Sequence, residues 1–99
     1  AVKEDVIDIE ELACRLIQLL WQRYPDALRE RYGIEEPEES TGFLGYDLLI
    51  AAGRKRGFLM ARAEVNTERM AKVLLDEYRG GKLGKFTLEM PPVQEENNG

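Results

Sequence analysis

DIEELACRLIQLLWQRY, Asp8 to Tyr24, is the stretch around which we expect the fold to be built. Asp8 followed by Glu11 resembles a capping box at the start of a helix, and Pro25 ends the pattern. Leu19 and Trp21 widen the apolar surface beyond one face, which indicates a helix at the centre of the molecule. The apolar positions recur at three- and four-residue spacing, which is typical of one helix face: Ile9, Leu12, Ala13, Leu16, Ile17, Leu20 and Tyr24.

Two further helices are predicted immediately after this segment. Pro25 opens a short helix, PDALRERY, and Gly33 ends it in the left-handed conformation. The next stretch, IEEPEES, is acidic and predicts a solvated loop. A third helix is expected to begin near Ser40 or Thr41, to run through FLGYDLLIAA, and to stop at Gly53.

The last third of the chain predicts one more helix, which Asn66 caps and Gly80 and Gly81 terminate. The preceding segment, FLMARAEV, is either extended or a loop, and its first three residues, Phe58 to Met60, are expected to return to the core. The following KLGKFTLE predicts an extended strap. Together these elements predict an all-α fold, a small bundle of three to four helices.

The length of the chain limits the number of domains that it can form. With 99 residues the chain can form one core but not two domains. We expect residues 1–89 to form the helical domain and residues 90–99 to be a disordered acidic tail. The chain has no initiator methionine, so we expect it to be an excised piece of a longer protein. No apolar run approaches the ~18–20 residues of a membrane span, so no membrane partner is expected.

Several kinds of chemistry are excluded by residue types. The chain has no histidine and one cysteine, Cys14, so it lacks Ser-His and Cys-His nucleophiles and the usual zinc ligand sets. Cys14 falls in the apolar helical pattern, which favours a small buried side chain, and a lone cysteine suits a reducing cytoplasm. The GGK sequence at Gly80 to Lys82 is not a phosphate-binding loop, because Leu83 stands where Ser or Thr must follow the lysine. We therefore predict that this chain is not itself an enzyme and holds no metal.

Positive charge is concentrated in one part of an acidic chain. The whole chain carries −5, but the stretch from Arg54 to Lys85 contains nine cations and four carboxylates. Arg54, Lys55 and Arg56 are consecutive, and Lys82 and Lys85 form a second cluster. A helix dipole would favour one or two cations at a helix end, at about 0.3–1 kcal/mol each, but three in a row exceed that use. Nucleic-acid contact, an acidic protein partner and a simple solvated surface all remain open from the charge alone.

Four segments occur in an order and spacing that identify a family. They are YPDALRERYGI (Tyr24 to Ile34), IAAGRKRGFLM (Ile50 to Met60), VNTERMAKVLLDEY (Val65 to Tyr78) and RGGKLGKFTLE (Arg79 to Glu89). Together they resemble the ribosome biogenesis GTPase A family of bacterial circularly permuted GTPases. The resemblance covers the chain from about Val6 to Glu89.

This resemblance implies the C-terminal helical domain of such a GTPase, without its GTPase domain. No G-x-x-x-x-G-K-[ST], N-K-x-D or D-x-x-G motif is present, so GTP, Mg²⁺ and GTP hydrolysis are expected in a missing N-terminal domain. The implied fold is similar to ANTAR domains, which bind RNA. The implied partners are ribosomal RNA of the large (50S) subunit precursor and the protein's own GTPase domain. The implied RNA-facing residues are Arg54, Lys55, Arg56, Lys82 and Lys85, followed by Arg79 and Arg62.

One feature departs from the family's pattern. Arg62 and Ala63 stand where the family leads us to expect small, glycine-like residues, so no residue of the family's pattern matches the arginine at position 62.

The RNA hypothesis has two rivals. The chain lacks a predicted ladder of exposed aromatics, so RNA contact is expected mainly at phosphates. The aromatic residues expected in the core are Trp21, Tyr24, Phe43, Tyr46 and Tyr78. The first rival is a protein-interaction module that docks on the GTPase domain or a ribosomal protein through an apolar patch at Trp21, Leu19 or Phe58. The second is an ANTAR-type output domain of a signalling protein.

Overall fold

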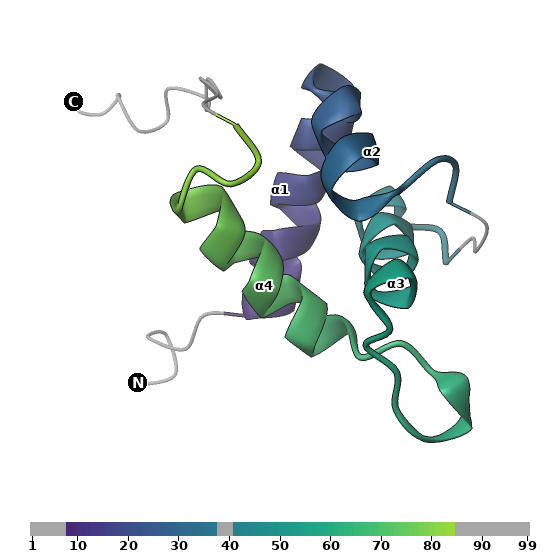
Figure 1. Cartoon of the computed structure of the whole chain (residues 1–99). Helices are drawn as coiled ribbons and strands as arrows, with labels where there is room; N and C mark the ends of the chain where they lie inside the picture. Colours follow the sequence, from purple (N-terminus) through teal and green to yellow (C-terminus); the bar gives the residue numbers. More distant parts are fainter. Residues whose placement is uncertain (1–7, 38–40, 85–99) are drawn as a thin grey trace, which may run out of the picture.

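The computed structural model describes residues 8–37 and 41–84, which form a helical bundle (Figure 1). In chain order the elements are α1 (Ile9–Arg23), α2 (Pro25–Tyr32), α3 (Leu44–Arg56), the short 3-10 turn η2 (Ala61–Ala63) and α4 (Thr67–Arg79). The predicted small all-α bundle is confirmed, with four α-helices in the described residues. Its likeness to ANTAR domains stays a prediction.

Helix α1 occupies the centre of the bundle, as predicted, and packs against α2, α3 and α4. The Asp8 carboxylate caps it by accepting the Glu11 backbone N–H at 3.1 Å. Its buried positions lie three and four residues apart: Ala13, Ile17 and Leu20. Leu12 was predicted to lie on this buried face, but its side chain is 46% exposed because it lies at the edge of the buried stripe.

Helix α2 follows the predicted boundaries. Pro25 occupies its first turn, where a missing N–H removes no helical hydrogen bond, and Gly33 ends it with φ 70°. Leu28 and Tyr32 are buried, and Ile34 extends the same core beyond the helix.

Helix α3 starts later than predicted. It begins at Leu44, after Phe43 in extended conformation. Thr41, one of the two expected starting residues, lies before the helix and donates its backbone N–H to the buried Asp47 carboxylate at 2.9 Å. Ser40 lies outside the described residues.

The predicted end of α3 at Gly53 is wrong. The helix continues for almost one more turn to Arg56, and Gly57 ends it in the left-handed region at φ 75°. Gly53 is buried inside the helix, where an added Cβ would lie 2.6 Å from Val65 Cγ1. Close packing against the segment before α4, and not a helix stop, therefore accounts for this glycine.

Helices α3 and α1 approach each other closely at Gly45. A Cβ added there would lie 2.4 Å from the Cys14 carbonyl oxygen and 3.0 Å from the Cys14 Cβ. A side chain of any size would push the two helix backbones apart. Gly45, Leu49 and Gly53 recur every four residues, so one narrow face of α3 packs inward.

The segment between α3 and α4 is a short hairpin. Leu59 and Val65 form an antiparallel bridge, and η2 turns the chain at the tip. Phe58 is partly buried against the core, as expected. Leu59 and Met60 are 49% and 48% exposed, so the expectation that they return to the core is wrong. Both residues belong to the hairpin, which projects from the end of α3 (Figure 1).

Helix α4 agrees with the prediction at both ends. The Asn66 side chain accepts the Arg69 N–H at 3.1 Å, and the helix ends at Arg79, before Gly80. Its buried residues are Thr67, Met70, Ala71, Leu74 and Leu75. Beyond it Leu83 returns to the core. Residues 85–89 of the predicted strap, with Lys85, and the predicted tail at 90–99 lie outside the described residues.

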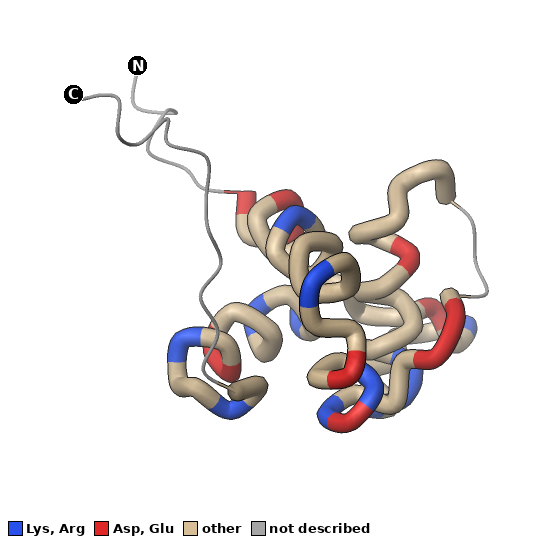
Figure 2. The backbone as a smooth tube through the Cα atoms, turned by 90° about the horizontal axis from the view of Figure 1, so that it is seen from above, with Lys and Arg blue, Asp and Glu red and all other residues tan. Residues whose placement is uncertain are grey.

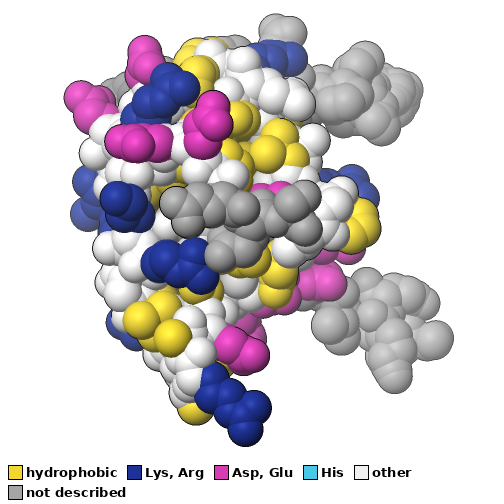
Figure 3. Space-filling model, turned by 90° about the vertical axis from the view of Figure 1, so that its right-hand side faces the viewer, with side chains coloured by type: hydrophobic (Ala, Val, Ile, Leu, Met, Phe, Trp, Pro, Cys, Tyr) yellow, Lys and Arg dark blue, Asp and Glu magenta, His cyan; other side chains and the backbone are white. Residues whose placement is uncertain are grey.

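The aromatic residues follow the prediction with one exception. Phe43 is 72% exposed because it precedes α3 and no element covers it. Tyr46 is half-buried, and its hydroxyl lies 3.3 Å from Thr67 Oγ1. Three others pack partly buried against the core: Trp21, Tyr24 and Tyr78. Exposed apolar side chains form separate small patches between charged ones on the face shown in Figure 3.

The contact at Gly45 generates a stability prediction. Gly45→Ala should lower the free energy of unfolding by about 1–3 kcal/mol, because the new methyl group overlaps a backbone carbonyl. Gly53→Ala is the matched comparison: its methyl meets a Val65 side chain that can rotate, and alanine gains about 1 kcal/mol of helix propensity. Thermal unfolding followed by circular dichroism should show the larger loss for Gly45→Ala. Equal or raised stability of Gly45→Ala would contradict the close approach.

Candidate nucleic-acid interface

The last turn of α3 carries the three consecutive cations, Arg54, Lys55 and Arg56. Their charges complement the helix dipole, and the Gly57 N–H is bonded to the carbonyls at the helix end. Successive residues in a helix point about 100° apart, so the three side chains leave the helix in different directions. They cannot act as one patch, and each has its own surroundings.

Arg56 points into the bundle. Its Nη2 lies 3.2 and 3.3 Å from the two carboxylate oxygens of Glu77 on α4. Its guanidinium also lies over the Tyr32 ring, 5.1 Å from the centroid. The sequence hypothesis that all three cations are unexplained by folding is wrong for Arg56, because this residue joins α3 to α2 and α4.

Glu77 is the centre of a polar cluster that comprises Glu77, Arg31, Tyr32 and Arg56, which we call the Glu77 cluster. Arg31 donates from Nε and Nη2 to the two Glu77 oxygens at 3.1 and 3.2 Å. The Tyr32 hydroxyl donates to Glu77 Oε1 at 2.8 Å. The Glu77 side chain is 15% exposed, so the two guanidinium groups compensate a carboxylate that is largely removed from water. Arg31 was not among the predicted site residues, and nothing in its local sequence indicates a partner 46 residues away.

The cluster shifts two pKa values. Partial burial by itself would raise the pKa of Glu77. Hydrogen bonds from Arg31 and Tyr32, with the charge of Arg56, outweigh burial and lower this pKa from 4.5 to about 2. Burial, followed by the hydrogen bond to Glu77, raises the pKa of the Tyr32 hydroxyl. At neutral pH the cluster therefore holds an ionised carboxylate and a neutral phenol.

The lowered pKa predicts acid sensitivity. Glu77 contributes stability that is fully present above pH 4.5 and is lost as the pH falls toward 2, because the folded state must then protonate a paired carboxylate. Glu77→Gln should unfold at a lower temperature than the wild type at pH 7, and this difference should shrink below pH 4.5. Thermal melts of both proteins between pH 7 and pH 2.5 measure this difference in unfolding temperature.

Glu68→Gln on the same helix is the control for that experiment. Glu68 is exposed and lies 3.7 Å from Lys72, a pair of the kind that contributes little. A pH-independent difference between Glu77→Gln and the wild type would contradict the ionised cluster.

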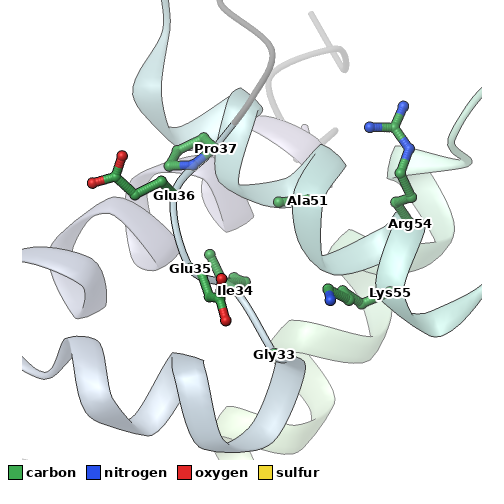
Figure 4. A pocket seen from close by; sticks show the side chains of 8 residues that line it. All are labelled: Gly33, Ile34, Glu35, Glu36, Pro37, Ala51, Arg54 and Lys55. Carbon is green, nitrogen blue, oxygen red and sulfur yellow. The ribbon is translucent and has the colours of Figure 1, made fainter.

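Arg54 and Lys55 line an open groove of about 440 Å³ between α3 and the segment after α2. The Lys55 side chain is directed toward that segment, and its stem would lie 3.6 Å from a Cβ on Gly33, whereas Arg54 is directed away from it (Figure 4). Glu35 and Glu36 line the opposite side of the groove. Both cations are exposed, so either can reach a ligand outside the bundle.

The remaining predicted cations are spread over the surface. Arg62 lies at the tip of the hairpin between α3 and α4. Arg79 is exposed at the end of α4, 3.7 Å from Asp76, and Lys82 is exposed in the following turn. Lys85 lies outside the described residues. Among the predicted cations, Arg54 lines two grooves. Lys55 lines the first with it, and the hairpin that carries Arg62 forms one side of the second.

Acidic residues gather at two places, one of which faces Arg54 and Lys55 across the groove. Figure 2 shows carboxylates in the first turn of α1 and in the segment after α2. These are Asp8, Glu10, Glu11, Glu35 and Glu36. The charge asymmetry predicted from the sequence therefore places acids at the beginning of α1 and after α2, and cations at the end of α3.

Three further findings concern the thiol, metal binding and membrane spans. Cys14 is partly buried, and burial, then the charges of Glu10, Asp8 and Glu11, raises the pKa of its thiol, so the side chain remains a protonated thiol. Within residues 8–37 and 41–84, no three His, Cys, Asp or Glu side chains are grouped so as to hold a metal ion. In the same ranges, each helix is too short or too polar to cross a membrane.

Comparison with known proteins gives a consistent result. No protein-family model matches the chain. Ribosome biogenesis GTPase A of Bacillus cereus is 34% identical over 92 residues, and that of Bacillus licheniformis is also 34% identical over 92 residues, 92% of this chain in each case. The resemblance to the ribosome biogenesis GTPase A family is confirmed. The same-named protein of Priestia megaterium is 31% identical over 97% of the chain.

The chain is much shorter than these family members. The matches cover 29% of the Bacillus cereus protein, 31% of the Bacillus licheniformis protein and 32% of the Priestia megaterium protein. The match therefore extends over nearly all of this chain and over less than a third of each relative.

Proposed function

We propose that this chain is the C-terminal helical domain of a ribosome biogenesis GTPase, and that it docks the protein on ribosomal RNA during assembly of the large subunit in the cytoplasm. The observation that carries this proposal is the match, over 92% of the chain, to proteins named ribosome biogenesis GTPase A.

The surface chemistry supports an RNA partner. Arg54 and Lys55 are exposed at the end of α3, away from the acidic first turn of α1, with Glu35 and Glu36 across the groove from them. RNA presents a regular array of phosphates, and cations on a folded surface bind it mainly through these groups. Arg56 is held by Glu77, so in this proposal it orients the last turn of α3 while its two neighbours contact phosphate.

The catalytic part of the parent protein would lie outside this chain. We propose that the parent hydrolyses GTP, in keeping with the word GTPase in the relatives' names. We further propose that GTP and Mg²⁺ bind to an N-terminal domain of the parent. The present residues would contribute RNA affinity and position that domain on the ribosomal precursor.

A second candidate function is docking on a protein, either the parent's own GTPase domain or a ribosomal protein. Phe43, at 72% exposure, and the adjacent Leu44, at 36%, give it a specific basis, because large exposed apolar side chains at neighbouring positions suit a protein contact. The expected apolar patch was at Trp21, Leu19 or Phe58, all of which are partly buried. Salt separates the two functions: phosphate binding weakens steeply with salt, and apolar docking does not.

The proposal predicts the effect of removing two cations. The double variant Arg54→Ala/Lys55→Ala should bind fluorescently labelled fragments of bacterial large-subunit ribosomal RNA more weakly than the wild type. The slope of log affinity against log salt should fall by about 2, which is one unit for each lost phosphate contact. Fluorescence anisotropy between 50 and 300 mM KCl measures both quantities.

Arg15→Ala/Arg23→Ala is the control, because it removes two exposed cations from α1 with the same change in net charge. It should leave the slope nearly unchanged. If both double variants lose equal affinity, binding depends on net charge and not on the end of α3. Salt-insensitive binding, or no binding by the wild type, would rule out phosphate docking.

A further inference from the structure

The tip of the hairpin between α3 and α4 has a backbone conformation that glycine would adopt more easily. Arg62 and Ala63 are consecutive residues with positive φ, 66° and 59°, and are the only non-glycine residues of that kind in the described ranges. The Ala63 N–H donates to the Met60 carbonyl at 3.1 Å, which makes Arg62 the third residue of a turn. Glycine is preferred there because side chains with a Cβ are strained. The backbone here is therefore one that glycine-like residues would adopt easily, although the chain has an arginine.

The hairpin is held in this conformation by its own hydrogen bonds. The Met60 N–H donates to the Glu64 carbonyl at 2.7 Å, and the Asn66 N–H donates to the Phe58 carbonyl at 2.7 Å. The Arg69 guanidinium covers the Phe58 ring, 4.1 Å from its centroid. The strained turn is therefore fixed on both sides and projects from the bundle at the end of α3 (Figure 1). Strained residues that a structure retains in this way concentrate at functional sites.

A groove separates the hairpin from the outer face of α3. Its volume is about 420 Å³, which is within the range of small-ligand sites. Ile50 and Tyr46 of α3 form one wall, and Met60 and Val65 of the hairpin form the other. Arg54 also lines it. The groove thus combines apolar walls and an aromatic ring with one cation, Arg54, and with two polar residues, Glu64 and Thr67.

The charge around this groove favours a polyanion. Residues 54–69 contain five cations and two carboxylates. Of these, Arg54 and Glu64 line the groove, and Arg62 lies beside it at the hairpin tip. Arg56 instead pairs with Glu77, and Lys55 lines the other groove. Apolar walls alone would suit many partners, but two arginines against one carboxylate leave a positive charge at this groove, which complements phosphate. RNA proteins recognise unpaired bases by inserting them between apolar or aromatic side chains, because a base inside a helix does not expose its face. A rigid hairpin beside a groove of this kind fits such a base.

We infer that the groove between the hairpin and α3 takes one unpaired nucleotide of RNA, with Met60 contacting the base and Arg62 contacting a neighbouring phosphate. This inference rests on the proposed function and adds recognition of a bulged or looped site to general phosphate binding. Arg62 supplies charge at the position where the backbone favours glycine, and the hydrogen bonds of the hairpin keep it in place.

The test compares two synthetic RNAs, a fully paired duplex and the same duplex with a three-nucleotide bulge. The wild-type chain should prefer the bulged RNA by about fivefold or more, the low end of what one base contact contributes. Met60→Ser should remove this preference and leave the salt dependence unchanged, whereas the matched control Met60→Leu should retain it. Anisotropy titrations of both RNAs at three salt concentrations measure these effects.

Arg62→Gly tests the turn without damage to the fold. Because glycine relaxes the positive φ, the thermal midpoint should be unchanged or a few degrees higher. Affinity for the bulged RNA should nevertheless fall, and its salt slope should decrease by about 1, while Arg62→Lys should retain most of the slope. A binding defect without a stability defect is a result that a purely structural role cannot give.

The failures of the two proposals are distinguishable. If Met60→Ser and Arg62→Gly bind both RNAs like the wild type while Arg54→Ala/Lys55→Ala does not, the hairpin inference is overturned and phosphate docking stands. Equal affinity of the wild type for the two RNAs also overturns the inference. If the wild type binds neither RNA nor the ribosomal fragments, the proposed function itself fails.

Discussion

The contact between the backbones of α1 and α3 at Gly45 is the constraint on which the rest of the structure depends. The Cys14 carbonyl occupies the space that any side chain at position 45 would need. This approach places Leu48 and Leu49 of α3 in the core with Ile17 and Leu20 of α1. It also fixes the direction in which α3 ends, and hence the positions of its last cations and of the hairpin that follows.

The Glu77 cluster holds one of those cations, Arg56, between the helices. A largely buried carboxylate requires compensation, and Arg31 and Arg56 provide it from two different helices. Arg56 is therefore part of the packing of α2, α3 and α4, whereas Arg54 and Lys55 face the surface. The three consecutive cations therefore differ in role: Arg56 packs between helices, and Arg54 and Lys55 are candidate contacts with RNA. They differ because each step along a helix turns the side chain by about 100°.

The sequence predicted the helices well where periodicity, caps and terminal glycines agree. Asp8, Pro25, Gly33 and Asn66 were assigned correctly because each acts on its immediate neighbours. Gly53 was misassigned because a buried glycine and a helix-ending glycine look the same in a sequence. For the candidate site, the sequence indicated the charged region, and the family resemblance marked Arg62 and Ala63 as a departure from its pattern. It could not indicate Arg31 as a partner of Glu77, or the groove beside Met60, since both depend on segments far apart in the chain.

By itself, then, the sequence determined the class of fold, the central helix, the uneven charge and the family resemblance, because these follow from local spacing and composition. Only the tertiary structure decided how the cations are used and which apolar side chains remain exposed. The physical reason is that packing and pairing depend on distances between helices. Those distances are set at positions such as Gly45, where two backbones meet. The sequence around such a position does not show which residue of another helix lies against it.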